Sequence, residues 1–269
     1  MNFFIITGTS KGLGEAIAKK LVSPDNQLAC ISRTKNLDLI DLADHKNCVL
    51  DYYEFDLTRI EEIKSLIKQI VDKIDKNKVE KITLINNAGT VEPIKPMGRS
   101  DDLDISRNIT LNLIAPSIMI NNFIKYTRDI PVKKDIVNIS SGAAKRAVFG
   151  WAPYCSSKAG INLLTETSAL ELEDTEYSVY SFSPGVVDTS MQKRIRNSSE
   201  EDFVELNRFI GLKEEGKLLK PSYVAEKLIE LLENNELKNG GIYHMHEFVN
   251  WVSPFKNLII VDFYGKILL

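Results

Sequence analysis

Residues 7–14 read Thr-Gly-Thr-Ser-Lys-Gly-Leu-Gly, between an apolar run at 3–7 and an amphipathic run at 13–22. Gly8 permits a tight turn, Gly12 lets the backbone approach a diphosphate, and Gly14 lets a helix pack against a strand. The helix start would offer free N–H groups and its positive dipole end to phosphates. A plain glycine-rich turn is the alternative, but the strand before and the helix after favour a dinucleotide-binding loop. Its expected cofactor contacts are Gly8, Ser10, Lys11, Gly12, Leu13 and Gly14.

Short apolar runs alternate with longer amphipathic runs along the rest of the chain. The predicted strands are 3–7, 28–32, 52–55, 82–85, 135–139, 178–182 and 241–244. The predicted helices are 13–22, 58–74, 105–126, 152–172 and 223–232. In the second of these helices, Thr58 is expected to cap the N-terminus, with Glu61 three residues later.

This βαβ alternation predicts a Rossmann-type, doubly wound parallel α/β sheet of about seven strands, with helices on both faces in three α/β/α layers. We predict one domain over residues 1–269. A charged, helical insertion near 189–220 interrupts the alternation and is expected to form a lid over the site. The apolar segment 247–269 is an atypical C-terminal extension.

The composition and charge of the chain argue against several classes of partner and function. With a formal net charge of -3, the chain gives no reason to expect nucleic acid or an anionic membrane as a partner. Its 3 cysteines have no CxxC spacing, which fits a reducing compartment and a cytoplasmic enzyme. The N-terminus reads as a strand and not as a signal peptide. His244 and His246 alone are too few ligands for a metal site.

The end of the second strand indicates the type of dinucleotide. An NAD-binding version usually carries Asp or Glu there, but this strand ends at Ser32 and Arg33. Arg33 can pair with a 2′-phosphate, and Lys11 is expected beside the same pocket. The pattern therefore favours NADPH/NADP+, with solvated surface charges as the alternative.

Tyr154 and Lys158 stand four residues apart on the predicted helix 152–172, so both side chains share one face. At about 4 Å and an effective dielectric of about 20, their attraction would be about 4 kcal/mol. That could lower the phenol pKa by on the order of three units. An isolated pair of this kind is usually a surface pair. Ser141, however, ends the strand just upstream, at the edge where such sheets bind ligands.

Together these motifs resemble the short-chain dehydrogenase/reductase family over nearly all of residues 1–246. In chain order they are Thr7-Gly8 with Gly12 and Gly14, Asn86-Asn87-Ala88-Gly89, Ser141, Tyr154 with Lys158, and Ser183-Pro184-Gly185. The resemblance implies Tyr154 as general acid, Ser141 as the hydroxyl that polarises the carbonyl, and Lys158 as the group that lowers the Tyr154 pKa and binds ribose. Asn112 would hold a water in a proton relay to the lysine, although a plain polar helix residue is its alternative. The remaining implied cofactor contacts are Asp56, Leu57, Asn86, Ala88, Gly89, Pro184, Gly185, Val187 and Thr189.

Within that family, residues 140–155 are similar to sepiapterin reductases, and residues 184–192 and 208–218 look like bacterial benzil reductases that form (S)-benzoin. This resemblance implies an NADPH-dependent carbonyl reductase acting on one carbonyl of an aromatic 1,2-diketone. Phe149, Trp151 and Met191 are expected to wall the substrate pocket, with core packing as the alternative for each. Reduction of a sepiapterin-type or other small ketone, and a non-catalytic dinucleotide-binding regulator, are the competing functions. The family also implies a homodimer or homotetramer.

Overall fold

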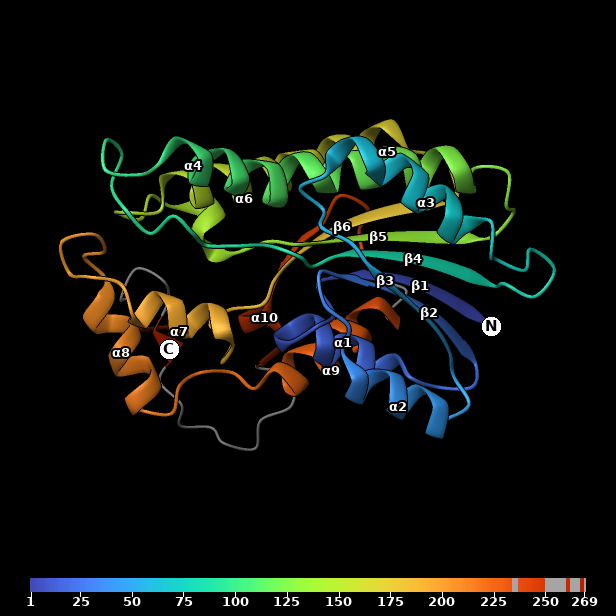
Figure 1. Cartoon of the computed structure of the whole chain (residues 1–269), viewed down its shortest axis with the longest axis horizontal. Helices are drawn as coiled ribbons and strands as arrows, with labels where there is room; N and C mark the ends of the chain where they lie inside the picture. Colours follow the sequence, from blue (N-terminus) through green and yellow to red (C-terminus); the bar gives the residue numbers. More distant parts are fainter. Residues whose placement is uncertain (234–236, 250–259, 262–266, 269) are drawn as a thin grey trace.

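The sheet at the centre of the molecule is parallel throughout (Figure 1). The computed structural model describes residues 1–233, 237–249, 260–261 and 267–268. Its main sheet has seven strands in the order β3-β2-β1-β4-β5-β6-β7. They are β1 (Asn2–Thr7), β2 (Asn26–Ser32), β3 (Val49–Glu54), β4 (Lys81–Asn86), β5 (Lys133–Ile139), β6 (Tyr177–Ser183) and β7 (Ile242–His244). The predicted fold class is confirmed, because the order reverses at β1 as in a doubly wound sheet.

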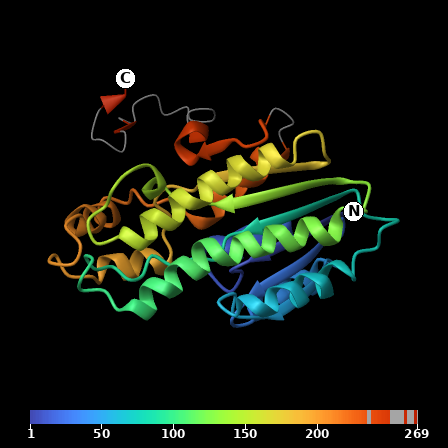
Figure 2. The ribbon, with the colours of Figure 1, turned by 90° about the horizontal axis from the view of Figure 1, so that it is seen from above.

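Helices cover both faces of the sheet. One face carries α3 (Ile63–Val71), α4 (Asp102–Ile109), α5 (Ala115–Thr127) and α6 (Ala152–Glu171). In Figure 2 the helices of this face run side by side along the strands. The other face carries α1 (Gly12–Leu21), α2 (Leu37–His45) and α9 (Pro221–Glu233). Shorter elements are η1 (Ile60–Glu62), the π-helical turn η2 (Thr110–Ile114), η3 (Gly142–Lys145), α10 (Met245–Val249) and the antiparallel pair β8 (Ile260–Val261) and β9 (Ile267–Leu268).

The strands separate two apolar cores. In β1, Phe3 and Ile5 pack with α3 and α5, whereas Phe4 and Ile6 pack with α1 and α9. A parallel sheet covered on both faces needs apolar residues at consecutive positions, and this explains why its strands read as continuous apolar runs. Each fully buried side chain of this size contributes roughly 1.5–3 kcal/mol relative to exposure. The two cores hold the carboxyl edge of the sheet rigid, and the site lies at that edge.

Two predicted helices differ from those observed. The expected cap at Thr58 is wrong, since its backbone N–H and its hydroxyl both donate to Asp56 Oδ1, at 3.0 and 2.8 Å. The chain there forms an Asx-type turn, and the helix begins only at η1. The single helix predicted over 105–126 is instead α4, the turn η2 and α5. Pro116 has no N–H to donate to the preceding turn, so the regular hydrogen-bond ladder is interrupted there.

The insertion after β6 contains two helices, α7 (Ser190–Arg196) and α8 (Leu206–Glu214). Its two ends meet, because Asp188 N donates to Leu219 O and Leu219 N donates to Val186 O, both at 2.9 Å. The segment therefore leaves the sheet and returns to the same place, beside the carboxyl ends of the strands. The predicted C-terminal extension 247–269 lies largely outside the described residues.

Candidate active site

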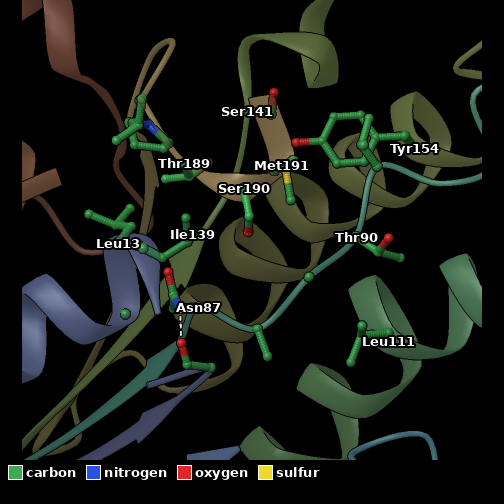
Figure 3. A pocket seen from close by; sticks show the side chains of 18 of the residues that line it. Leu13, Asn87, Thr90, Leu111, Ile139, Ser141, Tyr154, Thr189, Ser190 and Met191 are labelled. Atoms are coloured by element: carbon green, nitrogen blue, oxygen red, sulfur yellow. Dashed lines mark hydrogen bonds between the residues drawn. The ribbon is translucent and has the colours of Figure 1, made fainter. Parts of the chain in front are cut away.

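A continuous cleft runs along the carboxyl edge of the sheet, between the glycine loop and the insertion (Figure 3). Every cofactor contact predicted from the sequence lines it except Asn86. The Asn86 side chain is instead buried under the cleft, where its Nδ2 donates to Asn138 Oδ1 at 2.9 Å. The next residue, Asn87, lines the cleft in its place. The prediction of Asn86 as a cleft residue is therefore wrong, because the last residue of β4 points into the layer of helices.

Asn87 also fixes the glycine loop. Its Nδ2 donates to Thr7 O at 2.9 Å and to Gly8 O at 3.4 Å. A Cβ atom added to Gly14 would lie 2.3 Å from Gly8 O and 2.4 Å from Asn87 Nδ2, so only glycine fits there. Gly8 has φ +76, which also favours glycine. The glycine spacing predicted that Gly14 lets the helix pack closely, but the contact with Asn87 depends on how β4 ends.

The start of α1 fits the phosphates of a dinucleotide. Its N-cap residue, Lys11, makes no side-chain cap, so the first N–H groups of the helix keep their hydrogen-bonding capacity. Lys11 and Arg33 both line the cleft and are exposed. Neither has a carboxylate within ion-pairing distance in the part of the chain that the structure describes. Two cations and a free helix terminus at one place suit an anionic ligand.

Asp56 lies on the cleft wall near these cations. Burial acts to raise the pKa of Asp56, but hydrogen bonds from Thr58 and the charges of Arg33 and Arg107 outweigh it and lower that pKa. Asp56 is therefore a carboxylate at neutral pH. Its position two residues beyond β3, on the cleft wall, is compatible with the cofactor contact that the resemblance implies.

Ser141 and Tyr154 meet at the other end of the cleft. Ser141 follows β5, and its Oγ accepts a hydrogen bond from Ala143 N at 3.2 Å. Tyr154 lies in the first turn of α6 and is 6% exposed. Its phenol lies close enough to the Ser141 side chain for an interaction that acts to lower the Tyr154 pKa, and Figure 3 shows the phenol oxygen on the side of the ring nearer Ser141. Two segments therefore bring two O–H groups together at one point on the cleft wall.

Lys158 lies below Tyr154 on the same face of α6, as predicted. Its Nζ is 6.0 Å from the centroid of the Tyr154 ring and donates to Ile139 O at 2.7 Å. Burial lowers the pKa of Lys158 to about 8. Burial also raises the pKa of the Tyr154 phenol, and the interaction with the Ser141 side chain acts in the opposite sense. This direction is opposite to the one expected from the spacing alone, because desolvation is the largest influence on the phenol and Lys158 donates its hydrogen bond to Ile139 O instead. Tyr154 is consequently a protonated acid at neutral pH.

Asn112 lies in the π-helical turn η2, is 1% exposed and does not line the cleft. Its Oδ1 accepts from Thr90 N at 2.9 Å, and its Nδ2 donates to Thr90 O at 2.8 Å. A Cβ on Gly89 would lie 3.0 Å from Asn112 Oδ1 and 3.7 Å from Lys158 Nζ. Asn112 therefore acts as a positioning residue, because its two hydrogen bonds to Thr90 hold the segment after β4 next to Lys158. Its part in a proton relay stays a prediction.

Two of the three residues predicted to wall the substrate pocket line the cleft. Trp151 and Met191 line the cleft, but Phe149 does not and is 51% exposed. Gly150, at φ +80, turns the chain between them, so Trp151 points inward and Phe149 outward. The indole of Trp151 stacks on Phe203, with ring centroids 4.9 Å apart.

The insertion supplies wall residues that the sequence did not single out. Ile195 of α7 and Phe209 of α8 both line the cleft. Phe209 lies 5.6 Å from Trp151, and Tyr154 meets Trp151 edge-on at 5.4 Å. Nothing local in the sequence marks Phe209 as a site residue, because only the folded insertion brings it to the catalytic end of the cleft. The acid at Tyr154 thus stands against an aromatic wall.

The other features of the described residues give no second kind of site. The rings of His244 and His246 are 5.4 Å apart, and no group of three potential metal ligands occurs in the described ranges. Among those same residues, no helix combines the length and the apolar character that crossing a membrane requires.

A parallel sheet, a glycine loop and a phenol beside a hydroxyl and an amine define an oxidoreductase site of the dinucleotide-dependent class. Comparison with known proteins agrees. A family model described as short chain dehydrogenase matches residues 2–200. A benzil reductase ((S)-benzoin forming) of Bacillus cereus is 44% identical over 249 residues, covering 92% of this chain and 100% of that protein.

More distant relatives lead to the same family. The sepiapterin reductase of Bos taurus is 28% identical over 248 residues, covering 88% of this chain and 91% of that protein. The crystal structure of the KRED1-Pglu enzyme matches with a TM-score of 0.77 and 28% identity, covering 90% of this chain and 100% of that one. The chain belongs to the short-chain dehydrogenase family, and it is an oxidoreductase acting on carbonyl or hydroxyl groups.

Proposed function

We propose that the protein is an NADPH-dependent carbonyl reductase that reduces one carbonyl of an aromatic 1,2-diketone, converting benzil to (S)-benzoin. The observation that carries the proposal is the placement of the Tyr154 and Ser141 side chains together at one end of the cleft, against an aromatic wall. The 44% identity to a benzil reductase supports the choice of substrate.

The residues divide the chemistry between them. When bound, a reduced nicotinamide cofactor supplies the hydride. Ser141 donates a hydrogen bond to the carbonyl oxygen and so stabilises the charge that develops there. Tyr154, protonated at neutral pH, gives its proton to the same oxygen as general acid. Lys158 holds the ribose of the cofactor and is the group from which Tyr154 recovers a proton, with Asn112 positioned behind it.

NADPH is the proposed form of the cofactor because Lys11 and Arg33 lie on the cleft wall without carboxylate partners in the described residues. A 2′-phosphate would supply the missing anion, and no acidic residue stands at the end of β2 to repel it.

The setting of the enzyme is part of the same proposal. We place it in the cytoplasm, where the three free cysteines Cys30, Cys48 and Cys155 would stay reduced.

We also expect a homodimer or homotetramer. Leu163 and Leu170 are 64% and 71% exposed on the outer face of α6, which supports a subunit contact there. Light scattering of the protein and of the variant Leu163→Glu tests this expectation, and a monomeric parent would contradict it.

The deciding experiment follows NADPH oxidation with benzil, sepiapterin and a simple aliphatic ketone, and separates the products by chiral chromatography. We expect benzil to give the highest kcat/KM and (S)-benzoin as product. Tyr154→Phe serves as the control for the mechanism. A higher kcat/KM for sepiapterin would replace the substrate with the sepiapterin-type alternative. Cofactor binding without turnover of any carbonyl would favour the non-catalytic regulator, although the intact Ser141, Tyr154 and Lys158 speak against it.

A further inference from the structure

Gln192 is a polar residue on the substrate side of the cleft that no step of the chemistry above uses. It follows Met191 in α7 and lines the cleft together with Met191 and Ile195. In Figure 3, Met191 lies close to the end of the cleft that holds Ser141 and Tyr154. Gln192 is 7% exposed, and the apolar side chains of Met191 and Ile195 line the cleft beside it.

The amide of Gln192 has no hydrogen-bond partner in the described part of the chain. Its Oε1 is fully buried and unpartnered. Its Nε2 makes no hydrogen bond there either and is not among the buried unpartnered atoms, so Nε2 is the more accessible end of an amide that lines the cleft. The same wall holds a second unpartnered group, the buried Nε1 of Trp151. Leaving such groups unpaired is costly, and a native protein keeps them where a ligand completes them.

Other polar side chains near this wall are already engaged. Arg146 lines the cleft, but its guanidinium donates to both carboxylate oxygens of Glu205, at 2.6 and 2.9 Å. Arg194 also lines the cleft and donates to Glu92 at 2.6 Å. Gln192 therefore remains the amide donor with capacity for a ligand on this part of α7.

We propose that the Gln192 amide N–H donates a hydrogen bond to the diketone carbonyl that is not reduced, and so selects 1,2-diketones over monoketones of the same size. The inference rests on the proposed function and adds the residue that determines its substrate class. A hydrogen bond to the second oxygen draws electron density away from the neighbouring carbonyl carbon, which makes that carbon a better hydride acceptor. Hydrogen bonds to both oxygens of the diketone also determine which face of the reacting carbon is turned toward the hydride donor, and that face sets the configuration of the alcohol product.

A matched pair of substrates tests the proposal. Deoxybenzoin is benzil with one carbonyl replaced by a methylene group, so the ratio of the two kcat/KM values reports on the second carbonyl. In Gln192→Met, which keeps the length of the side chain and loses the amide, we expect this ratio to fall about tenfold, the size of one hydrogen bond lost in a transition state. In Gln192→Glu the ratio should fall at least as far at neutral pH, since a carboxylate cannot donate to a carbonyl.

Met191→Leu is the control, because it changes the apolar wall one residue away and should alter both substrates by similar factors. The melting temperature of Gln192→Met should not fall, since the substitution removes an unpartnered buried oxygen; if that variant fails to fold, Gln192→Leu replaces it. An unchanged ratio in the Gln192 variants overturns the inference, and so does an equal fall in Met191→Leu. Failure of the parent enzyme to reduce either compound would instead refute the proposed function.

Discussion

Replacing Arg33 by serine should remove most of the preference for NADPH over NADH. Arg33 follows β2, lines the cleft and is exposed, and it forms no ion pair with a carboxylate of the described residues. A guanidinium about 4 Å from a phosphate charge gains about 1 kcal/mol at the dielectric constant of water and about 4 kcal/mol at an effective value of about 20. These two energies correspond to roughly fivefold and roughly 900-fold changes in the dissociation constant of NADPH.

Because Arg33 is exposed, the effect should lie toward the lower limit, about ten- to fiftyfold. The assay is the ratio of kcat/KM for NADPH to that for NADH, measured with benzil at low and high salt. In Arg33→Ser the NADPH value should fall while the NADH value changes little, and the parent's preference should weaken with added salt.

Lys35 offers a matched control in the same turn. It is also exposed, but its Nζ lies 3.7 Å from Glu54 Oε1, and it does not line the cleft. Lys35→Ser should therefore leave the ratio near that of the parent. An unchanged ratio in Arg33→Ser, or an equal fall in both variants, would refute the assignment of Arg33 to the 2′-phosphate.

Three further predictions follow from the geometry of the catalytic end. Tyr154→Phe removes the proton donor, so kcat should fall by about a hundredfold or more while NADPH binding, followed by fluorescence, persists; substantial turnover would contradict the general-acid role. The folded-state pKa of Lys158, about 8, lies below the ordinary 10.5, so the unfolded chain binds the extra proton between these values and stability should rise with pH there. Relative to Lys158→Met, the free energy of unfolding of the parent protein without cofactor, measured with urea, should rise by about 2.5 kcal/mol between pH 7 and pH 10, and a parallel pH dependence of the two proteins would argue against a buried ammonium. A Cβ on Gly150 would lie 2.1 Å from Asp202 O, so Gly150→Ala should displace the insertion from Trp151, raising the KM for benzil more than that for NADPH; equal effects on both KM values would separate this contact from the substrate site.

Much of the site was predictable because its signals are local. The glycine spacing at 8–14 required a strand-to-helix turn, and the structure has β1 and α1 on either side of it. Tyr154 and Lys158 share a face of α6 because a helix repeats every three to four residues. Ser141 follows β5, and the carboxyl end of a parallel strand faces the ligand crevice.

The errors arose where orientation depends on a single residue. Asn86 and Asn87 differ by one position at the end of a strand, so one points into the layer of helices and the other lines the cleft. Phe149 and Trp151 are separated by Gly150, whose positive φ reverses which side chain faces inward. Apolar character was the same for both aromatic residues and could not distinguish them.

The sequence by itself determined the parallel α/β sheet, the glycine loop between β1 and α1, and the phenol, amine and hydroxyl that we propose as catalytic groups, because each depends on residues that are neighbours in the chain. Only the tertiary structure decided the direction of the Tyr154 pKa, the presence of Phe209 in the wall and the unpartnered amide of Gln192. Desolvation and hydrogen-bond partners are set by segments far apart in sequence, and they come into existence only when the insertion folds over the end of the sheet.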